Sequence, residues 1–264
     1  MNAKELAGAG RLSEALTALQ AEIRRNPADQ KSRVFLFQLD CLLGHLEKAL
    51  TQLQVVASMD AETMMLAQIF RPIIVCEMLR RDVFAGTRTP LIFGEPAEWV
   101  GLLVQANAMV AGGHYESARD LRQRAFEMAP ATAGKMNGQP FEWLADADSR
   151  LGPILELILE GKYYWVPFGR IARIEIEKPV DLRDLVWLPA RFTWTNGGAV
   201  SGHIPVRYVG TEAMDDDALR MARATTWREA AEGCFLGLGQ RILTTDAGEY
   251  PLLECRSIEL TAGI

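Results

Sequence analysis

The first 58 residues carry apolar side chains at helical spacing, in two segments that are near copies of each other. GRLSEALTALQ begins at residue 10 and GHLEKALTQLQ begins at residue 44, so the two lie 34 residues apart. In both, apolar residues recur at every third or fourth position, which predicts amphipathic helices. A glycine precedes each helix, where a tight turn between helices needs a positive φ. The pattern predicts two helical hairpins over residues 2–58.

The same period continues, with one interruption, to residue 130. A period of 34 residues with a small residue at the helix crossing is typical of tetratricopeptide repeats. The pattern returns in residues 112–130, and a helix is predicted over residues 96–111. These segments favour a domain of tetratricopeptide-like helical repeats over residues 1–130. Stacked hairpins of this kind leave a curved groove that suits a partner helix or an extended peptide.

Residues 61–95 interrupt the period. Residues 61–84 are strongly apolar and helical in pattern, and Pro72 is expected to kink this helix or to start a new one. A loop is predicted over residues 85–96. We expect the apolar stripe of the segment to be core, and the alternative is an adaptable peptide-binding surface, for which methionine is suited. The stripe consists of Met64, Met65, Ile69, Phe70 and Met78.

Beyond residue 130 the pattern changes. Residues 131–160 are predicted to be a linker and two short helices, the helices covering residues 141–151 and 153–161. The apolar period then drops to two, in β-branched and aromatic runs that predict strands. These runs are residues 162–168, 170–179, 185–195, 199–209 and 241–245. We therefore predict an α+β fold, in which N-terminal all-α repeats are followed by a smaller β-rich α+β domain over residues 161–264.

Two turn signals lie within the β-rich half. The Asn-Gly pair at residue 196 is favoured in a type I′ hairpin turn, in which both central residues have positive φ. A second, weaker signal is Asp-Ala-Gly at residue 246. The residues assigned to these structural turns are Asn196, Gly197, Asp246 and Gly248. Between the turns, residues 211–227 predict a helix whose three aspartates at residues 215–217 would cap its start, with a metal site as the alternative.

Composition and charge narrow the possible functions. The chain has 264 residues, 49% of them apolar, and a net charge of −6. Nucleic acids and anionic membranes require a positive surface, so neither is expected as a partner, whereas basic groups on a protein partner would be favoured. A secretory signal core and a run of 18 apolar residues are both missing, which predicts a soluble, cytoplasmic protein. Buried, reduced thiols are expected at Cys41, Cys76, Cys234 and Cys255.

The sequence contains no convincing catalytic constellation. None of the three histidines, His45, His114 and His203, belongs to a metal-binding motif, and no phosphate-binding or nucleophile motif occurs. We therefore expect no enzyme, no cofactor and no metal. Ser201 and His203 share one face of a predicted strand, which is weak evidence for a nucleophile and its base. An enzyme would need a polar pocket in this half, formed by Trp194, Asn196, His203 and Arg207.

The C-terminal half contains three long strings: LPARFTWTNGGAVSGHIPVRYVGTE (188–212), DDALRMARATTW (216–227) and GLGQRILTTDAGEYPLLECRSIEL (237–260). These strings resemble the ImpE/TagJ family, whose members are accessory proteins of bacterial type VI secretion. The resemblance implies a cytoplasmic, non-enzymatic protein that binds an N-terminal helix of the small sheath subunit. It also implies a link to the ATPase that recycles contracted sheath. The alternative is a regulatory or chaperone-like repeat protein acting on another secretion component, and the sequence assigns no partner-binding residues.

Overall fold

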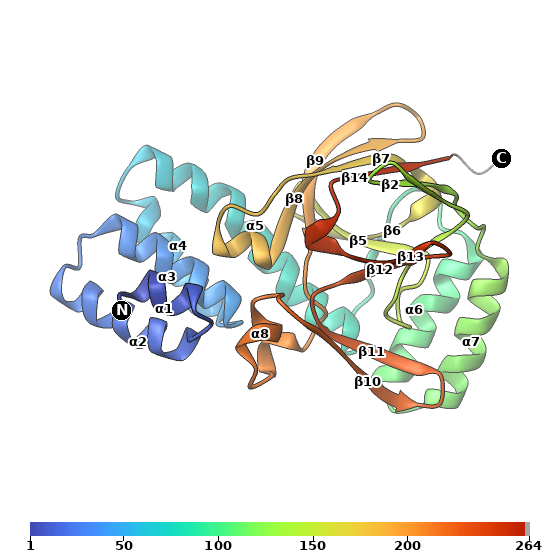
Figure 1. Cartoon of the computed structure of the whole chain (residues 1–264), viewed down its shortest axis with the longest axis horizontal. Helices are drawn as coiled ribbons and strands as arrows, with labels where there is room; N and C mark the ends of the chain where they lie inside the picture. Colours follow the sequence, from blue (N-terminus) through green and yellow to red (C-terminus); the bar gives the residue numbers. More distant parts are fainter. Residues whose placement is uncertain (262–264) are drawn as a thin grey trace.

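The computed structural model describes residues 1–261 and begins with seven helices (Figure 1). Their bounds are α1 Ala3–Gly8, α2 Leu12–Arg25, α3 Gln30–Leu42, α4 Leu46–Ala57, α5 Ala61–Phe84, α6 Glu98–Ala111 and α7 Tyr115–Met128. The pairs α1–α2, α3–α4 and α6–α7 are the hairpins that the period predicts. No helix within residues 1–261 is long and apolar enough to cross a membrane.

The periodic glycines close these hairpins in one shared geometry. Gly10, Gly44 and Gly113 have φ values of +76°, +75° and +78°. In each case the residue after the glycine donates its backbone N–H to a carbonyl five residues earlier, which is the bond of a Schellman motif. The three bonds are Arg11 N to Leu6 O at 3.0 Å, His45 N to Asp40 O at 2.8 Å and His114 N to Met109 O at 2.8 Å. The repeat in the sequence is thus a repeat of helix-ending turns.

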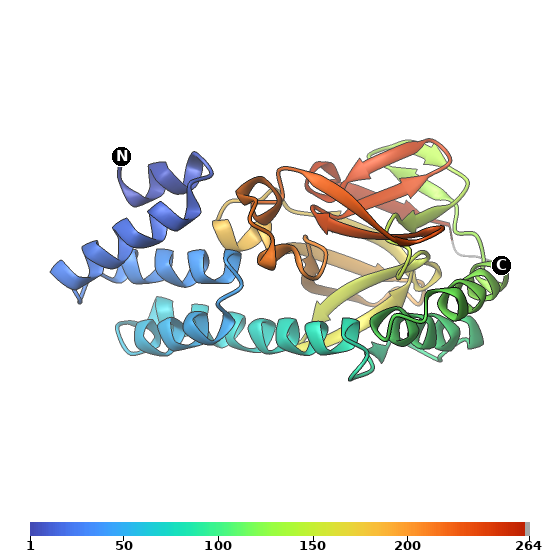
Figure 2. The ribbon, with the colours of Figure 1, turned by 90° about the horizontal axis from the view of Figure 1, so that it is seen from below.

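Helix α5 separates the hairpins in space. It is one helix of 24 residues that continues through Pro72, so no new helix starts there. Its start is capped by Asp60, whose side chain accepts a hydrogen bond from Thr63 N at 2.8 Å. At about 1.5 Å per residue, α5 is roughly 36 Å long. Figure 2 shows α1–α4 near one end of α5 and α6–α7 near its other end, with the sheet beside it.

The segment predicted as a linker with two short helices is a set of strands. Residues 131–160 form β2 Gly134–Met136, β3 Gln139–Phe141, β4 Leu144–Asp146 and β5 Ile154–Leu159. The helix prediction was wrong for β5 because all six of its residues are buried. A strand that is covered on both faces has no alternation of period two, so a short apolar run cannot be told from a buried helix. The domain boundaries at residues 130 and 160 stay a prediction.

A nine-stranded sheet forms the centre of the second half, with the order β1-β6-β5-β9-β8-β7-β14-β2-β3. Four of the predicted strand runs, residues 162–168, 170–179, 185–195 and 199–209, are confirmed within it, and the fifth, residues 241–245, is confirmed in a smaller sheet. The further strands of the nine-stranded sheet are β1 Leu91–Ile92, β6 Lys162–Pro167, β7 Ile171–Ile176, β8 Trp187–Trp194, β9 Ala199–Pro205 and β14 Ser257–Leu260. A smaller sheet joins β4 to β12 Ile242–Thr245 and β13 Gly248–Pro251, and β10 Thr225–Ala231 pairs with β11 Cys234–Gly239.

The helix predicted over residues 211–227 is mostly absent. Residues Thr211–Ala213 form a short 3-10 helix, only α8, Asp217–Arg220, is α-helical, and residues from Thr225 onward form β10. Asp216 caps α8 as the sequence suggests, since its side chain accepts from Ala218 N at 2.8 Å. The helix ends at Arg220, and Ala222, two residues further on, has a φ of +53°. The Thr-Thr-Trp run that follows favours a strand, and its pairing with β11 decides the outcome.

One hydrophobic core joins the helices to the sheet. Side chains of the helical half, including Phe37, Phe70 and Phe84, belong to the same buried cluster as Trp165 and Trp187 of the sheet. The Phe37 and Phe70 ring centres lie 5.8 Å apart, and those of Phe84 and Trp165 lie 6.0 Å apart. The opposite face of the sheet forms a second cluster. All four cysteines are free and buried, as predicted.

The connection between β9 and β10 holds the first two hairpins against the sheet. Asp217 accepts a hydrogen bond from Leu12 N at 2.8 Å and so caps the start of α2 from a distance of 205 residues in sequence. Arg223 donates to the carbonyl of Gly8 at 2.8 Å. At the second hairpin, Glu212 packs on Gly44, where an added Cβ would lie 2.6 Å from the Glu212 Cγ. The hairpin turns are therefore docking points as well as chain reversals.

The turn at Asn196 and Gly197 differs in type from the prediction. A type I′ turn needs positive φ at both central residues, but only Gly197 has it, at +86°. Gly197 N donates to Trp194 O at 2.9 Å, and Trp194 N donates to Gly198 O at 2.8 Å. These bonds fit a three-residue loop with glycine in the left-handed position. In the second turn, Gly248 has φ +147° and Asp246 accepts from a backbone N–H at 2.7 Å.

Replacing Gly197 with valine is expected to lower the free energy of unfolding by roughly 1–3 kcal/mol, because a β-branched residue is strained at positive φ. An added Cβ would meet open space, so the cost is backbone strain alone. Thermal unfolding followed by circular dichroism measures the effect. Ala199→Val, at an exposed position in the next strand, is the matched control and should be close to neutral. An unchanged melting temperature for Gly197→Val would contradict this account of the turn.

Candidate partner-binding groove

An open groove lies on the face formed by the first helices of the first two hairpins and by the start of α5. Helices α1 and α3, the first half of α5 and the segment over residues 179–185 enclose about 980 Å³. Most of its surface is apolar, as helix recognition requires. The apolar side chains that line it include Val34, Phe35, Met65, Leu66, Ile69, Val180, Leu182 and Leu185. A cavity of this size and character is suited to a partner segment.

The exposed part of the groove comes from the stripe that the sequence analysis assigned to the core. Met64, Met65 and Ile69 are 45%, 62% and 50% exposed, so the core prediction was wrong for them, whereas Phe70 is buried. Met65 and Ile69 lie one turn apart and both line the groove. They stay uncovered because the next hairpin, α6–α7, packs near the far end of α5 (Figure 2). The surface interpretation of the methionines therefore applies to this part of the stripe.

The sheet half closes one end of the groove. Its 3-10 helix, η2 Leu182–Leu185, follows β7 and reaches α3, where Leu182 N donates to the Gln38 side chain at 3.1 Å. The Arg183 guanidinium lies 4.7 Å from the centre of the Phe70 ring and pairs with Asp181 at 2.5 Å. Val180, beside them, is 90% exposed. The end wall is thus held rigidly and presents an apolar side chain at the opening.

The residues named for an enzyme pocket do not form one. Trp194 stacks on Phe93 with ring centres 4.1 Å apart, and Asn196 lies in the exposed turn. His203 lies beside Phe70, and burial lowers its pKa to about 4. Arg207 is buried and donates to backbone carbonyls of Leu42 at 2.7 Å and of Arg220 at 2.6 Å. None of these side chains lines the groove, so the structure removes this form of the enzyme hypothesis.

The three aspartates at residues 215–217 do not gather into a metal site. Asp216 caps α8, while Asp217 accepts from Leu12 N and pairs with Arg220 at 3.1 Å. Across the part of the chain that the structure describes, no group of three or more His, Cys, Asp or Glu side chains is placed to hold a metal ion. Asp216 has the capping role that the sequence analysis favoured, whereas Asp217 caps the start of α2 instead.

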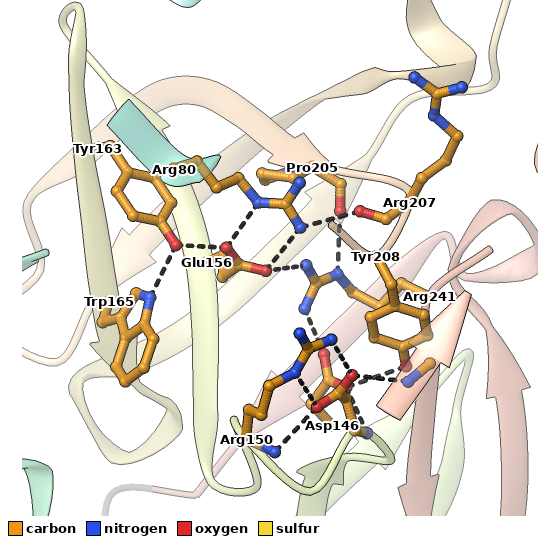
Figure 3. Close-up of polar contacts among 12 residues, drawn as sticks. Arg80, Asp146, Arg150, Glu156, Tyr163, Trp165, Pro205, Arg207, Tyr208 and Arg241 are labelled. Atoms are coloured by element: carbon orange, nitrogen blue, oxygen red, sulfur yellow. Dashed lines mark hydrogen bonds and ion pairs between the residues drawn. The ribbon is translucent and has the colours of Figure 1, made fainter. Parts of the chain in front are cut away.

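A buried network of charges connects the helical half to the sheet (Figure 3). Arg80 on α5 donates to both carboxylate oxygens of Glu156 on β5, at 2.7 and 3.0 Å, and to the carbonyl of Arg207 at 2.9 Å. Arg241, immediately before β12, pairs with both Glu156 and Asp146. The Arg241 and Glu156 side chains are completely buried. One carboxylate therefore holds α5, β5 and the start of β12 together.

The pKa values in this network show which carboxylate is fully compensated. Burial opposes ionisation of Glu156, but Arg80 and Arg241 outweigh it and lower the pKa of Glu156 to about 2. Burial dominates at Asp146 and raises its pKa to about 6, despite the pair with Arg241. The Tyr163 hydroxyl also donates to Glu156, and the Trp165 indole donates to Tyr163 at 2.7 Å. Because these groups make their hydrogen bonds and ion pairs with one another, they form a structural joint between the helical half and the sheet.

The arrangement defines a class of protein: helical hairpins docked on a β-rich half, with an open apolar groove on the helical face. Residues 138–259 match the family described as "ImpE protein". The chain is also 47% identical, over 98% of its length and 91% of the relative, to the type VI secretion system accessory component TagJ of Pseudomonas aeruginosa. The chain therefore belongs to the ImpE/TagJ family, as its C-terminal strings indicated.

A solved structure has the same fold over nearly the whole chain. The crystal structure of protein VPA1032 from Vibrio parahaemolyticus matches with a TM-score of 0.91 and 27% sequence identity. The match covers 99% of this chain and 98% of that one. The relation therefore extends over the hairpins, α5 and the sheet together, which is more than the family match to residues 138–259 covers.

Proposed function

We propose that this protein is a non-enzymatic, cytoplasmic accessory protein of bacterial type VI secretion that binds the contractile sheath. Its groove takes an amphipathic helix, which we assign to the N-terminus of the small sheath subunit. The observation that carries this proposal is the uncovered pair Met65 and Ile69 in an apolar groove of about 980 Å³. The 47% identity to a type VI secretion accessory component supports the setting.

The dimensions of the groove suit a short helix. Its α3 wall extends from Gln30 to Gln38, and its α5 wall extends from the cap Asp60 to Ile69. At about 1.5 Å per residue, each wall is roughly 12–14 Å long, which matches two to three turns of a bound helix. Such a helix would place apolar residues at positions i, i+3 or i+4, and i+7 against the groove. Flexible methionines adapt to such side chains at little cost.

A peptide titration tests the proposal. A fluorescently labelled N-terminal peptide of the cognate small sheath subunit should bind the full-length protein with a Kd at or below tens of micromolar, measured by anisotropy. Ile69→Asp should weaken binding at least about ten-fold, or ~1.4 kcal/mol, because it places a charge on the apolar wall. Val75→Asp is the matched control: Val75 lies on the same helix with similar exposure, 52% against 50%, but outside the groove.

Two results would count against the proposal: no binding of the peptide to the wild-type protein, or equal weakening by both aspartate variants. Pull-downs from cells with and without the sheath subunits test the wider setting. Recovery of another secretion component in cells that lack the sheath would favour the regulatory or chaperone-like alternative. Probing the same samples for the sheath-recycling ATPase tests whether that link depends on the sheath.

A further inference from the structure

The groove carries opposite charges on its two walls. Lys4 on α1 and Lys31 on α3 lie on one side, where they also line a smaller cavity between the first hairpin and α3. Asp60 and Glu62 lie on the other side, at the start of α5. The third pair of charges, Asp181 and Arg183, forms an ion pair of its own at the closed end. The positive and negative side chains that line the groove are therefore equal in number. The net negative charge of the whole chain does not apply to this surface.

Two of the wall charges are available to a partner. Asp60 is engaged in capping α5, and the Lys4 ammonium lies 5.9 Å from the centre of the Phe35 ring. Lys31 and Glu62 are both exposed, and neither belongs to an ion pair within residues 1–261. The apolar side chains that line the groove with them include Phe35 and Ile69. The groove thus presents a cation on one rim and an anion on the other.

We propose that the groove selects an amphipathic helix whose apolar stripe is bordered by acidic residues on one side and basic residues on the other. This inference rests on the proposed function, because it takes the occupant to be a helix. If the bound helix is reversed in direction while its apolar stripe still contacts the groove, the acidic and basic borders of the stripe exchange sides. Like charges would then face each other across both rims. The two walls therefore determine the direction in which the helix binds.

Charge reversal tests the selection. The probe is the labelled N-terminal peptide of the cognate small sheath subunit, titrated by anisotropy at 50 mM and 500 mM NaCl. Lys31→Glu and Glu62→Lys should each weaken binding several-fold at low salt, with a smaller effect at high salt because rim charges are screened. Replacing the acidic border of the peptide by lysine should restore binding to Lys31→Glu. The controls are Glu47→Lys and Lys48→Glu, exposed positions on α4 that lie outside the groove.

Cross-linking tests the direction. A photo-reactive group placed at one end or the other of the peptide should label residues 179–185 from one end only, as located by mass spectrometry. The double variant Lys31→Glu/Glu62→Lys should lose this preference or reverse it. Labelling from both ends in the wild-type protein would overturn the inference.

The outcomes separate this inference from the proposed function. If the wild-type protein binds the peptide but the groove variants behave like the α4 controls, the charge selection is wrong and the binding function stands. If the wild-type protein does not bind the peptide, the proposed function itself fails. Sedimentation of the purified protein tests whether a second copy of the chain occupies the groove instead. The inference would be overturned if the wild-type protein formed a dimer that the peptide does not dissociate and that Ile69→Asp converts to a monomer.

Discussion

Replacing Glu156 with glutamine is expected to lower the free energy of unfolding by about 3–5 kcal/mol, because it leaves buried arginines without their common counter-charge. Arg80 and Arg241 both pair with this carboxylate (Figure 3), and their side chains are only 3% and 0% exposed. Urea unfolding followed by circular dichroism measures the loss. The matched control is Glu175→Gln, which breaks an exposed pair with Arg173 at 3.3 Å and should cost less than about 1 kcal/mol.

The same network predicts a direction for the pH dependence. The pKa of Glu156 is lowered from 4.5 to about 2, so its charge stabilises the fold at neutral pH, and this contribution is lost as the pH falls from about 4.5 toward 2. Glu156→Gln should lack this part of the acid sensitivity. Similar losses in Glu156→Gln and in the Glu175→Gln control would show that the network is not a structural joint.

The second large effect is expected at Gly44. Gly44→Ala should lower the free energy of unfolding by about 2–4 kcal/mol, because positive φ and a steric clash act together. The new Cβ would lie 2.6 Å from the Glu212 Cγ, beside the ion pair of Glu212 with Arg81 at 3.1 Å. Relieving the clash would move the second hairpin away from the segment between β9 and β10. Differential scanning calorimetry or urea unfolding would measure the loss.

Gly113→Ala is the control for this prediction. Gly113 closes its hairpin with φ +78°, close to the +75° of Gly44, but an added Cβ there has no neighbour within 4 Å. It should therefore cost only the backbone strain, about 1–2 kcal/mol. The difference between the two variants isolates the docking of the hairpin on the sheet half. Equal losses would mean that Gly44 acts through its backbone conformation alone.

Local signals predicted much of the secondary structure because they depend on nearby residues. The glycines before α2, α4 and α7 predicted the hairpins, since only glycine takes positive φ without strain at a helix end. Alternating β-branched and aromatic residues predicted β6 to β9 and β12. The same signals failed for β5, whose residues are all buried, and for residues 211–227, where pairing with β11 outweighs helix propensity after α8.

The candidate site could not be predicted in the same way. Met65 and Phe70 belong to one apolar stripe in the sequence, yet one is 62% exposed and the other is 5% exposed. The buried network unites Arg80, Glu156 and Arg241, which belong to unrelated segments and carry no shared motif. Whether a charged residue is buried or solvated depends on neighbours that are distant in sequence. Only the assembled fold supplies those neighbours.

The sequence by itself thus determined the hairpins, their glycine turns, four of the nine strands of the large sheet and the family resemblance that the comparisons confirm. These features follow from backbone preferences and from strings of residues that are read along the chain. The tertiary structure alone decided that α6–α7 packs near the far end of α5 and leaves Met65 and Ile69 uncovered (Figure 2). The physical reason is that a groove consists of surface that no other element covers, and coverage depends on the placement of the whole chain in space.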